Sequence, residues 1–145
     1  MTKVIFLCTG NTCRSQMAEG FARDFGKGII EAYSAGLAPA GEVHPRAIAV
    51  MKEQGIDISQ QKSKGIDIGI LQEVDVIITL CGHAEESCPW TSTPVQRIHW
   101  PINDPVRATG TDEEIMNEFR TSRDEIRKRL LEFIEDRKKG GVHGE

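Results

Sequence analysis

A cysteine and an arginine near the start of the chain flank a loop whose composition suits an oxyanion. Cys8 follows an apolar run, and Arg14 and Ser15 close the loop. Loop N–H groups and the positive end of a following helix attract an anion, and the planar guanidinium of Arg14 matches a tetrahedral oxyanion. The same field favours the thiolate form of Cys8, a strong nucleophile, and Ser15 can donate its hydroxyl to that sulfur. We predict that Cys8 is a nucleophile and that the oxyanion is held by Thr9, Gly10, Asn11, Thr12, Cys13, Arg14 and Ser15.

The residues on both sides of this loop have patterns that would hold it in place. Residues 4–7 form an apolar run typical of a short buried strand. No Gly-Lys-Ser/Thr follows Gly10, and no further glycines stand at the spacing of a dinucleotide-binding fingerprint, so two other kinds of phosphate loop are excluded. After the loop, helical spacing of apolar residues predicts a helix that opens near Arg14 and contains Met17, Ala18, Phe21, Ala22 and Phe25.

Strand and helix patterns continue to alternate along the rest of the chain. Strands are predicted at residues 29–35, 74–80 and 96–100, and the second of these is nearly continuous and β-branched, as in a strand covered on both faces. A second helix is predicted from Pro45 to Gly55. Such alternation implies an α/β fold, in which helices cover both faces of a parallel sheet.

Two further segments complete this prediction. In residues 56–69 we predict short, irregular helical turns capped by Ser59 or Ser63. Thr111 and Glu114 form a capping box that begins a long last helix. Its inner face is predicted to contain Ile115, Phe119, Ile126, Leu130, Phe133 and Ile134.

Composition limits the classes of protein that this chain can belong to. Its 145 residues suit a single domain, which we place at residues 1–137, followed by a flexible polar tail at 138–145. The net charge of −4 argues against binding to nucleic acid or to a membrane surface. A strand starts within a few residues of the N-terminus, with no room for a signal peptide, so we expect a cytoplasmic protein, and we expect a monomer.

A second pair of cysteines stands near the end of the predicted strand at 74–80. Cys81 ends that strand as Cys8 ends the first strand, and Cys88 follows seven positions later. Ligands of parallel sheets bind beyond the carboxyl ends of the strands, so we expect Cys8 and Cys81 to be neighbours. Taken alone, Cys81 could be a core residue and Cys88 a helix-end cysteine, since cysteine is often buried.

The motif Cys-x5-Arg-Ser, placed between a strand and a helix, resembles the phosphate-binding loop of low-molecular-weight tyrosine phosphatases and of the arsenate reductases that share their fold. The resemblance covers almost the whole chain and implies a four-stranded parallel sheet in the order 2-1-3-4. The Cys-x6-Cys spacing of Cys81 and Cys88 resembles the redox segment of thioredoxin-coupled arsenate reductases. A buried structural Cys8 beside an ordinary turn is the alternative.

This resemblance implies a reaction cycle. Cys8 attacks arsenate, with phosphate or sulfate as competing oxyanions, and Asp104 protonates the departing oxygen. Cys81 then forms a disulfide with Cys8, Cys88 carries the oxidation outward as Cys81–Cys88, and thioredoxin reduces that disulfide. No cofactor and no resident metal are implied. Asp104-Pro105 is by itself a common turn pair, so the role of Asp104 rests on the resemblance.

The spacing of Cys81 and Cys88 has a geometric consequence. Seven residues of helix rise by about 10.5 Å, whereas a disulfide tolerates about 4.4–6.8 Å between Cα atoms. If residues 82–88 are helical when reduced, the Cys81–Cys88 disulfide requires that helix to unwind.

Other functions remain open on the sequence alone. A low-molecular-weight tyrosine phosphatase usually has a tyrosine soon after its Asp-Pro pair, but Val106 and Arg107 stand here and Tyr33 is the only tyrosine. An oxyanion or metal sensor would use the same cysteines, but no DNA-binding helix-turn-helix is apparent. Zinc binding by Cys81, His83 and Cys88 does not match a recognised spacing. We interpret Cys13 as structural.

One position departs from the family pattern. Some thioredoxin-coupled arsenate reductases bind potassium beside the loop, and the resemblance matches three of its ligand positions to Asn11, Glu19 and Ser34. The fourth, an aspartate there, falls on Lys64. An ammonium would remove a ligand and repel the ion, and could itself occupy the ion's place and donate to Glu19 and Asn11. The alternative is that Lys64 is an ordinary surface lysine.

Overall fold

The computed structural model describes residues 1–81 and 95–142, and residues 82–94 and 143–145 lie outside this description. Strands and helices alternate through most of the described chain, as predicted. The elements are β1 (Thr2–Cys8), α1 (Arg14–Phe25), β2 (Ile30–Gly36), α2 (Pro45–Lys52), α3 (Ile68–Glu73), β3 (Val76–Thr79), β4 (Gln96–His99), the 3₁₀ helix η1 (Pro105–Arg107) and α5 (Asp112–Val142).

The four strands in the described part of the chain form one parallel sheet, and its order confirms the prediction. The order is β2-β1-β3-β4, so β1 lies in the interior of the sheet between β2 and β3. Cys8 pairs with Gly36 on β2, and Leu7 pairs with Thr79 on β3. This register brings the carboxyl ends of β1 and β3 to the same edge of the sheet, where ligands of α/β proteins bind.

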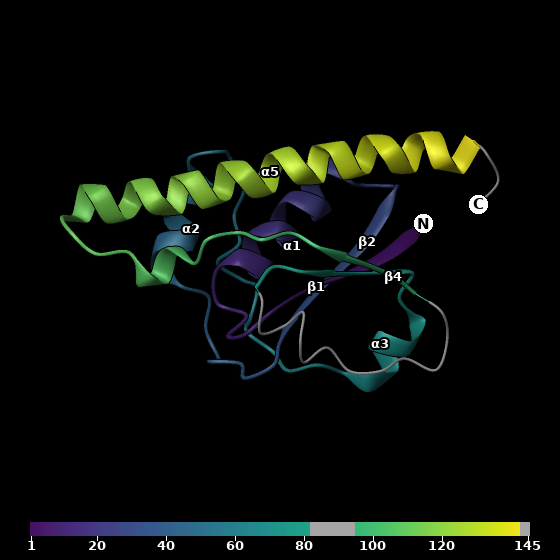
Figure 1. Ribbon diagram of the computed structural model, residues 1–145, viewed down its shortest axis with the longest axis horizontal. Coiled ribbons are helices and arrows are strands. Elements are labelled where there is room, and N and C mark those ends of the chain that lie inside the picture. The colour runs from purple at the N-terminus through teal and green to yellow at the C-terminus, as the bar shows by residue number, and fades with distance from the viewer. Residues whose placement is uncertain (82–94, 143–145) are drawn as a thin grey trace.

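Both faces of the sheet are covered. Successive residues of β1 point to opposite faces, so each face contributes apolar side chains to a core of its own. Val4 and Phe6 are buried in the core that packs against α1, α2 and α5. Ile5 and Leu7 are buried on the other face, in a smaller core that includes Leu71 of α3. Figure 1 shows this arrangement, with α5 along one side of the molecule and α3 on the opposite side of the strands.

The last helix, α5, begins where it was predicted to begin and runs further than predicted. Thr111 Oγ1 accepts from the Glu114 N–H (3.1 Å), and the Glu114 carboxylate accepts from the Thr111 N–H (3.2 Å), so the capping box is confirmed. The expected polar tail is wrong for residues 138–142, because the helix continues to Val142. The predicted inner face is buried at Phe119, Ile126, Leu130, Phe133 and Ile134, and Ile115 is partly buried against it.

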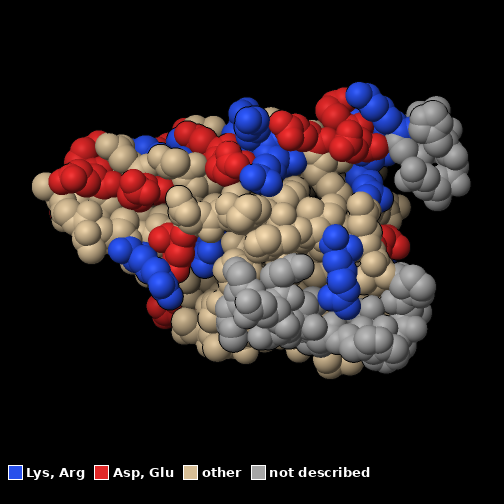
Figure 2. All heavy atoms as spheres, in the orientation of Figure 1, with Lys and Arg blue, Asp and Glu red and all other residues tan. Residues whose placement is uncertain are grey.

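Charged side chains gather on the outer side of α5. Figure 2 shows Lys and Arg alternating with Asp and Glu along this helix, above a mostly uncharged body. Opposite charges alternating in this way suit a solvent-exposed helix face. None of the helices in the described part of the chain is both long and apolar enough to cross a bilayer.

The prediction of helical turns within residues 56–69 is wrong for most of that segment. Within this segment no helix begins before Ile68, where α3 starts. The N-cap of α3 is Asp67, whose carboxylate accepts from the Gly69 and Ile70 N–H groups. Ser63 has another task, because its hydroxyl donates to the carbonyl of Gly10 (2.8 Å). A tertiary contact with the Cys8–Ser15 loop thus replaces the local cap that the sequence suggested.

Candidate active site

The loop between β1 and α1 is held in place by hydrogen bonds that its carbonyl groups accept from the segment after β2. The carbonyls of Cys8, Thr9, Gly10 and Thr12 accept from backbone N–H groups of Leu37, Ala38, Ala40 and His44, at 2.8–3.2 Å. Because the N–H and C=O of a peptide unit point in opposite directions, the N–H groups that follow these carbonyls turn toward the inside of the loop. Inward N–H groups beside a helix N-terminus are the arrangement that the predicted anion-binding loop requires.

Asn11 shapes this loop through its backbone and its side chain. Its φ of 52° lies in the left-handed region, which asparagine adopts more readily than most residues. The side-chain amide is fully buried and donates to Ser15 Oγ (2.8 Å) and Ser34 Oγ (3.1 Å). The Asn11 side chain therefore supports the loop from inside the protein and does not line the cavity.

Gln16 is a supporting residue that the sequence analysis missed. It is fully buried on α1, and its Nε2 donates to the carbonyl oxygen and the side-chain oxygen of Asn11 (2.9 and 3.0 Å). Its own side-chain oxygen accepts from Gln61 Nε2 (2.7 Å). Gln16 lies roughly opposite the apolar face of the predicted helix and belongs to no motif, so no sequence signal pointed to this role.

Gly36 is required by the close approach of the loop to β2. A Cβ built at this position would lie 2.6 Å from the Thr9 carbonyl oxygen and 2.9 Å from the Asn11 N. Both atoms belong to the loop backbone, so a side chain here would force the loop itself to shift. The glycine that ends β2 thus allows the loop to close over the strand end.

Cys8 lies at the floor of a cavity of about 570 Å³ at the carboxyl ends of β1 and β3. Its Sγ lies 2.9 Å from Ser15 Oγ, so the predicted contact of the hydroxyl with the sulfur is confirmed. Ser15 contacts the Cys8 sulfur and does not itself line the cavity. The lining residues are Cys8, Thr9, Gly10, Thr12, Cys13, Arg14, Cys81, Ile102, Asn103, Asp104, Val106 and Arg107.

Arg14 is positioned by backbone carbonyls from two other segments. Its Nη1 donates to the carbonyls of Leu80 (3.1 Å) and Ile102 (2.9 Å). Its Nη2 lies 3.6 Å from Asp104 Oδ2. The guanidinium is thus fixed at one end by backbone carbonyls, and at the other end it forms an ion pair with the predicted acid.

Asp104 is held by its own helical turn as well as by arginines. Its Oδ1 accepts from the Val106 N–H (3.0 Å) and caps η1. Oδ2 faces Arg14 and also lies 3.8 Å from Nε of Arg107, an exposed cavity residue that the sequence analysis did not single out as a cation of the site. The structure therefore places Asp104 in the lining of the same cavity as Cys8.

Cys81 lies in the same cavity as Cys8, as the strand pattern predicted. The Leu80 N–H donates to the Leu7 carbonyl (2.9 Å), so the two strands deliver their following cysteines side by side. Thr9 Oγ1 lies 3.3 Å from Cys81 Sγ. Thr9 is thus a loop residue that also contacts the second thiol.

Cys13 is buried, as its interpretation as a structural residue requires. Burial raises the pKa of its thiol, and the negative charges of Asp104 and Cys8 raise this pKa further. A neutral thiol is a weak nucleophile. Cys13 therefore lines the cavity without the charge state that attack on a substrate needs.

Several predicted features lie outside the described residues. They are Cys88, the helix predicted at 82–88, and the alternative zinc site, which requires His83 and Cys88. Among residues 1–81 and 95–142, no group of His, Cys, Asp and Glu is arranged to hold a metal ion.

Lys64 contacts the residues matched to the potassium site. Its Nζ lies 3.5 Å from Glu19 Oε1 and 3.3 Å from Ser34 Oγ, and it donates to the Lys62 carbonyl (2.9 Å). Asn11 Oδ1 accepts from the Lys64 backbone N–H (2.8 Å), not from the ammonium. Lys64 thus supplies a positive charge beside a carboxylate that is almost fully buried.

We therefore expect exchange of potassium for sodium, at fixed ionic strength, to leave both activity and melting temperature unchanged. Lys64→Asp should create a potassium dependence, because it returns an anionic oxygen ligand and removes the ammonium. Thermal melts and turnover in the two salts measure this. Lys62→Asp is the matched control, since it makes the same charge change at an exposed neighbour. Specific potassium activation of the unmodified protein would contradict the prediction.

Comparison with known proteins gives a consistent result. Residues 3–141 match the family model of low molecular weight phosphotyrosine protein phosphatases. An arsenate reductase of Halalkalibacterium halodurans is 51% identical over 132 residues, which are 91% of this chain and 94% of that protein. A solved arsenate reductase in the oxidized state aligns with a TM-score of 0.77 and 38% identity, covering 94% of this chain and 99% of that chain.

A further solved structure carries a more specific description. The thioredoxin-dependent arsenate reductase of Corynebacterium glutamicum aligns with a TM-score of 0.69 and 27% identity. The alignment covers 93% of this chain and 62% of that chain. The likeness to these proteins thus extends over nearly the whole of the present chain.

Proposed function

The chain belongs to the low molecular weight phosphotyrosine protein phosphatase family, and we propose that it is an arsenate reductase of this family whose thiols are regenerated by thioredoxin. One observation carries the proposal: Cys81 lines the same cavity as Cys8. A phosphatase needs only its nucleophilic cysteine, whereas the reduction of arsenate consumes two electrons. A pair of thiols that closes to a disulfide supplies them.

In the first step, the thiolate of Cys8 attacks arsenic, and an As–O bond breaks as the S–As bond forms. The loop N–H groups and Arg14 hold the remaining oxygens. Contacts with other segments already fix these groups, so they need not reorganise when the substrate binds. Asp104 donates a proton to the departing oxygen, which leaves as water. Arsenic is still in its +5 state in the resulting adduct.

In the second step, the thiolate of Cys81 attacks the sulfur of Cys8. The electron pair of the S–As bond stays on arsenic, which becomes +3 and leaves as arsenite, while Cys8 and Cys81 form a disulfide. The hydroxyl of Thr9 lies 3.3 Å from Cys81 Sγ and supports this thiol beside the loop. The reduction of arsenic is thus balanced by the oxidation of two sulfurs.

In the third step, Cys88 attacks Cys81, which releases Cys8 as a thiolate and leaves a Cys81–Cys88 disulfide. Thioredoxin then reduces this disulfide by the same exchange chemistry. The part of Cys88 rests on its spacing from Cys81, since it lies outside the described residues. We further propose that phosphate and sulfate compete with arsenate and that the protein works as a cytoplasmic monomer.

A weak phosphatase activity is the second candidate function, and the loop favours it. The same N–H groups and Arg14 suit phosphate as well as arsenate, because both are tetrahedral oxyanions. No aromatic side chain lines the described part of the cavity, so a phenyl ring would find few walls to stack on. We therefore place aryl phosphates below arsenate as substrates.

The two activities separate in one assay. The reduced protein is incubated with arsenate, thioredoxin, thioredoxin reductase and NADPH, and the loss of NADPH is compared with the arsenite formed. An aryl phosphate replaces arsenate in a parallel reaction. We expect arsenate-dependent loss of NADPH and slow phosphate release. Fast phosphate release with no use of NADPH would favour a phosphatase, and tight oxyanion binding without turnover would favour a sensor.

A further inference from the structure

The segment that carries Asp104 has little regular structure of its own. It runs from the end of β4 at His99 to η1, which begins at Pro105. Pro105 restricts the backbone of the residue before it, and Asp104 has the extended conformation (φ −81°, ψ 107°) that this restriction favours. The direction of the Asp104 side chain therefore depends on the peptide units that precede it.

Two side chains hold those peptide units. Arg14 Nη1 donates to the Ile102 carbonyl (2.9 Å) from the catalytic loop. Ser122 Oγ, on α5, donates to the Asn103 carbonyl (3.1 Å). The Asn103 carbonyl belongs to the peptide unit that joins Asn103 to Asp104, so Ser122 acts one bond away from the backbone of the acid.

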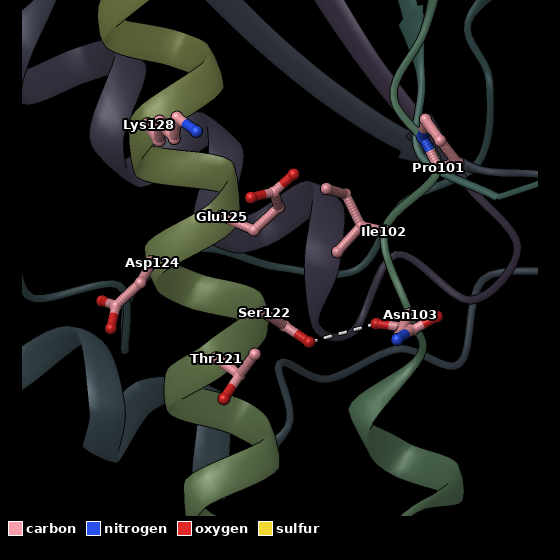
Figure 3. A pocket seen from close by; sticks show the side chains of 8 residues that line it. All are labelled: Pro101, Ile102, Asn103, Thr121, Ser122, Asp124, Glu125 and Lys128. Carbon is pink, nitrogen blue, oxygen red and sulfur yellow. Dashed lines mark hydrogen bonds between the residues drawn. The ribbon is translucent and has the colours of Figure 1, made fainter.

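A second cavity lies beside the hydrogen bond between Ser122 and Asn103. A cavity of about 520 Å³ lies between the Asp104 segment and α5, and both Ile102 and Asn103 line this cavity as well as the catalytic one. Figure 3 shows the Ser122–Asn103 hydrogen bond crossing from α5 to the segment. Ile102 and Asn103 thus separate two cavities, and the Ser122 hydrogen bond links this segment to α5 beside one of them.

Ser122 donates its hydroxyl to the Asn103 carbonyl and not to a carbonyl of its own helix. Its side chain is buried (4% exposed). The neighbouring Thr121 lines the same cavity, but its hydroxyl donates to the Asn117 carbonyl of its own helix (2.9 Å), as hydroxyls within helices commonly do. Of these adjacent hydroxyls, only that of Ser122 reaches the Asp104 segment.

We propose that Ser122 is a positioning residue for Asp104, which it holds in place through the Asn103 carbonyl so that proton donation to the departing oxygen is efficient. This inference rests on the acid role of Asp104 in the proposed function. Ser122 does not touch the substrate, so its loss should slow proton transfer without weakening the binding of the oxyanion. A geometric error in a catalytic group lowers the rate of the chemical step.

Ser122→Val and Ser122→Thr form the test pair, since they have nearly the same volume and differ in the hydroxyl. The measurement is the single-turnover rate of arsenite formation at saturating arsenate. We expect Ser122→Val to be about three- to tenfold slower, the effect of one net hydrogen bond, and Ser122→Thr to keep the rate. The inhibition constant of inorganic phosphate should not change. Thr121→Val is the matched control and should react at the normal rate.

A double-mutant cycle with Asp104→Asn separates positioning from general destabilisation. Ser122→Val should add no further loss in the Asp104→Asn protein, because a positioning residue acts only through the acid. An additional loss there, or equal rates for the Val and Thr variants, would overturn the inference. Ser122→Ala is a smaller variant that repeats the cycle if Val does not fold. A normal rate for Asp104→Asn itself would instead refute the proposed acid.

Discussion

Cys8→Ser should abolish arsenate reduction, with a loss on the order of 10⁵–10⁶-fold, comparable to the removal of other catalytic nucleophiles. An alcohol at the floor of the cavity is a far poorer nucleophile than a thiolate, although it occupies nearly the same space. The hydrogen-bond partner Ser15 and the surrounding N–H groups remain, so oxyanion binding should survive. Coupled NADPH oxidation measures the first effect, and calorimetric titration with phosphate measures the second.

Cys13→Ser is the matched control, because Cys13 is buried in the same loop and lines the same cavity. Burial and two neighbouring negative charges raise the pKa of its thiol, which keeps it neutral near pH 7. We expect Cys13→Ser to retain turnover. Measurable multiple turnover by Cys8→Ser, or complete inactivity of Cys13→Ser in a folded protein, would show that the nucleophile has been misassigned.

A Cys88→Ser protein should complete one reduction and then stop. It retains Cys8 and Cys81, so it can release one arsenite and form the Cys8–Cys81 disulfide, but it lacks the thiol that frees Cys8 again. A burst of about one arsenite per protein, followed by no further NADPH oxidation, is the expected time course. Mass spectrometry of digests should find the Cys8–Cys81 disulfide in the stalled protein.

Cys81→Ser provides the contrast. This variant should form the Cys8–arsenate adduct but release no arsenite, because no thiol then lies beside Thr9 to attack the sulfur of Cys8. Cys81→Ser should thus stop before arsenite release, and Cys88→Ser should stop after it. Full multiple turnover by Cys88→Ser would eliminate the proposed relay, and a burst from Cys81→Ser would mean that another thiol replaces Cys81.

The fold was predictable in outline because its signals are local. The apolar run of β1 and the capping box of α5 depend on residues close in sequence, and both are confirmed. The prediction of capped helical turns in residues 56–69 is wrong because Ser63 contacts the loop at Gly10, far away in sequence, whereas Asp67 caps the helix. The end of α5 was placed too early because polar residues there suggested a tail.

The supporting contacts of the site were beyond reach of the sequence. Arg14 was identified as a ligand of the oxyanion, but its anchors are the carbonyls of Leu80 and Ile102, groups that every residue has. Gln16 carries no motif, and its role appears only when α1 buries it against Asn11. Backbone carbonyls and buried amides acquire functions through position, which residue type does not encode.

By itself, the sequence determined the strand ends that carry Cys8 and Cys81, and it predicted the nucleophile and the oxyanion loop, because each depends on short-range pattern and on side-chain chemistry. Only the tertiary structure decided how the loop, Arg14 and Asp104 are oriented relative to one another. It turned the loop carbonyls outward, joined Arg14 to Asp104 across the cavity, and brought Ser122 of α5 to the segment of the acid. Such contacts join residues far apart in the chain, so they exist only once the sheet order and helix packing have formed.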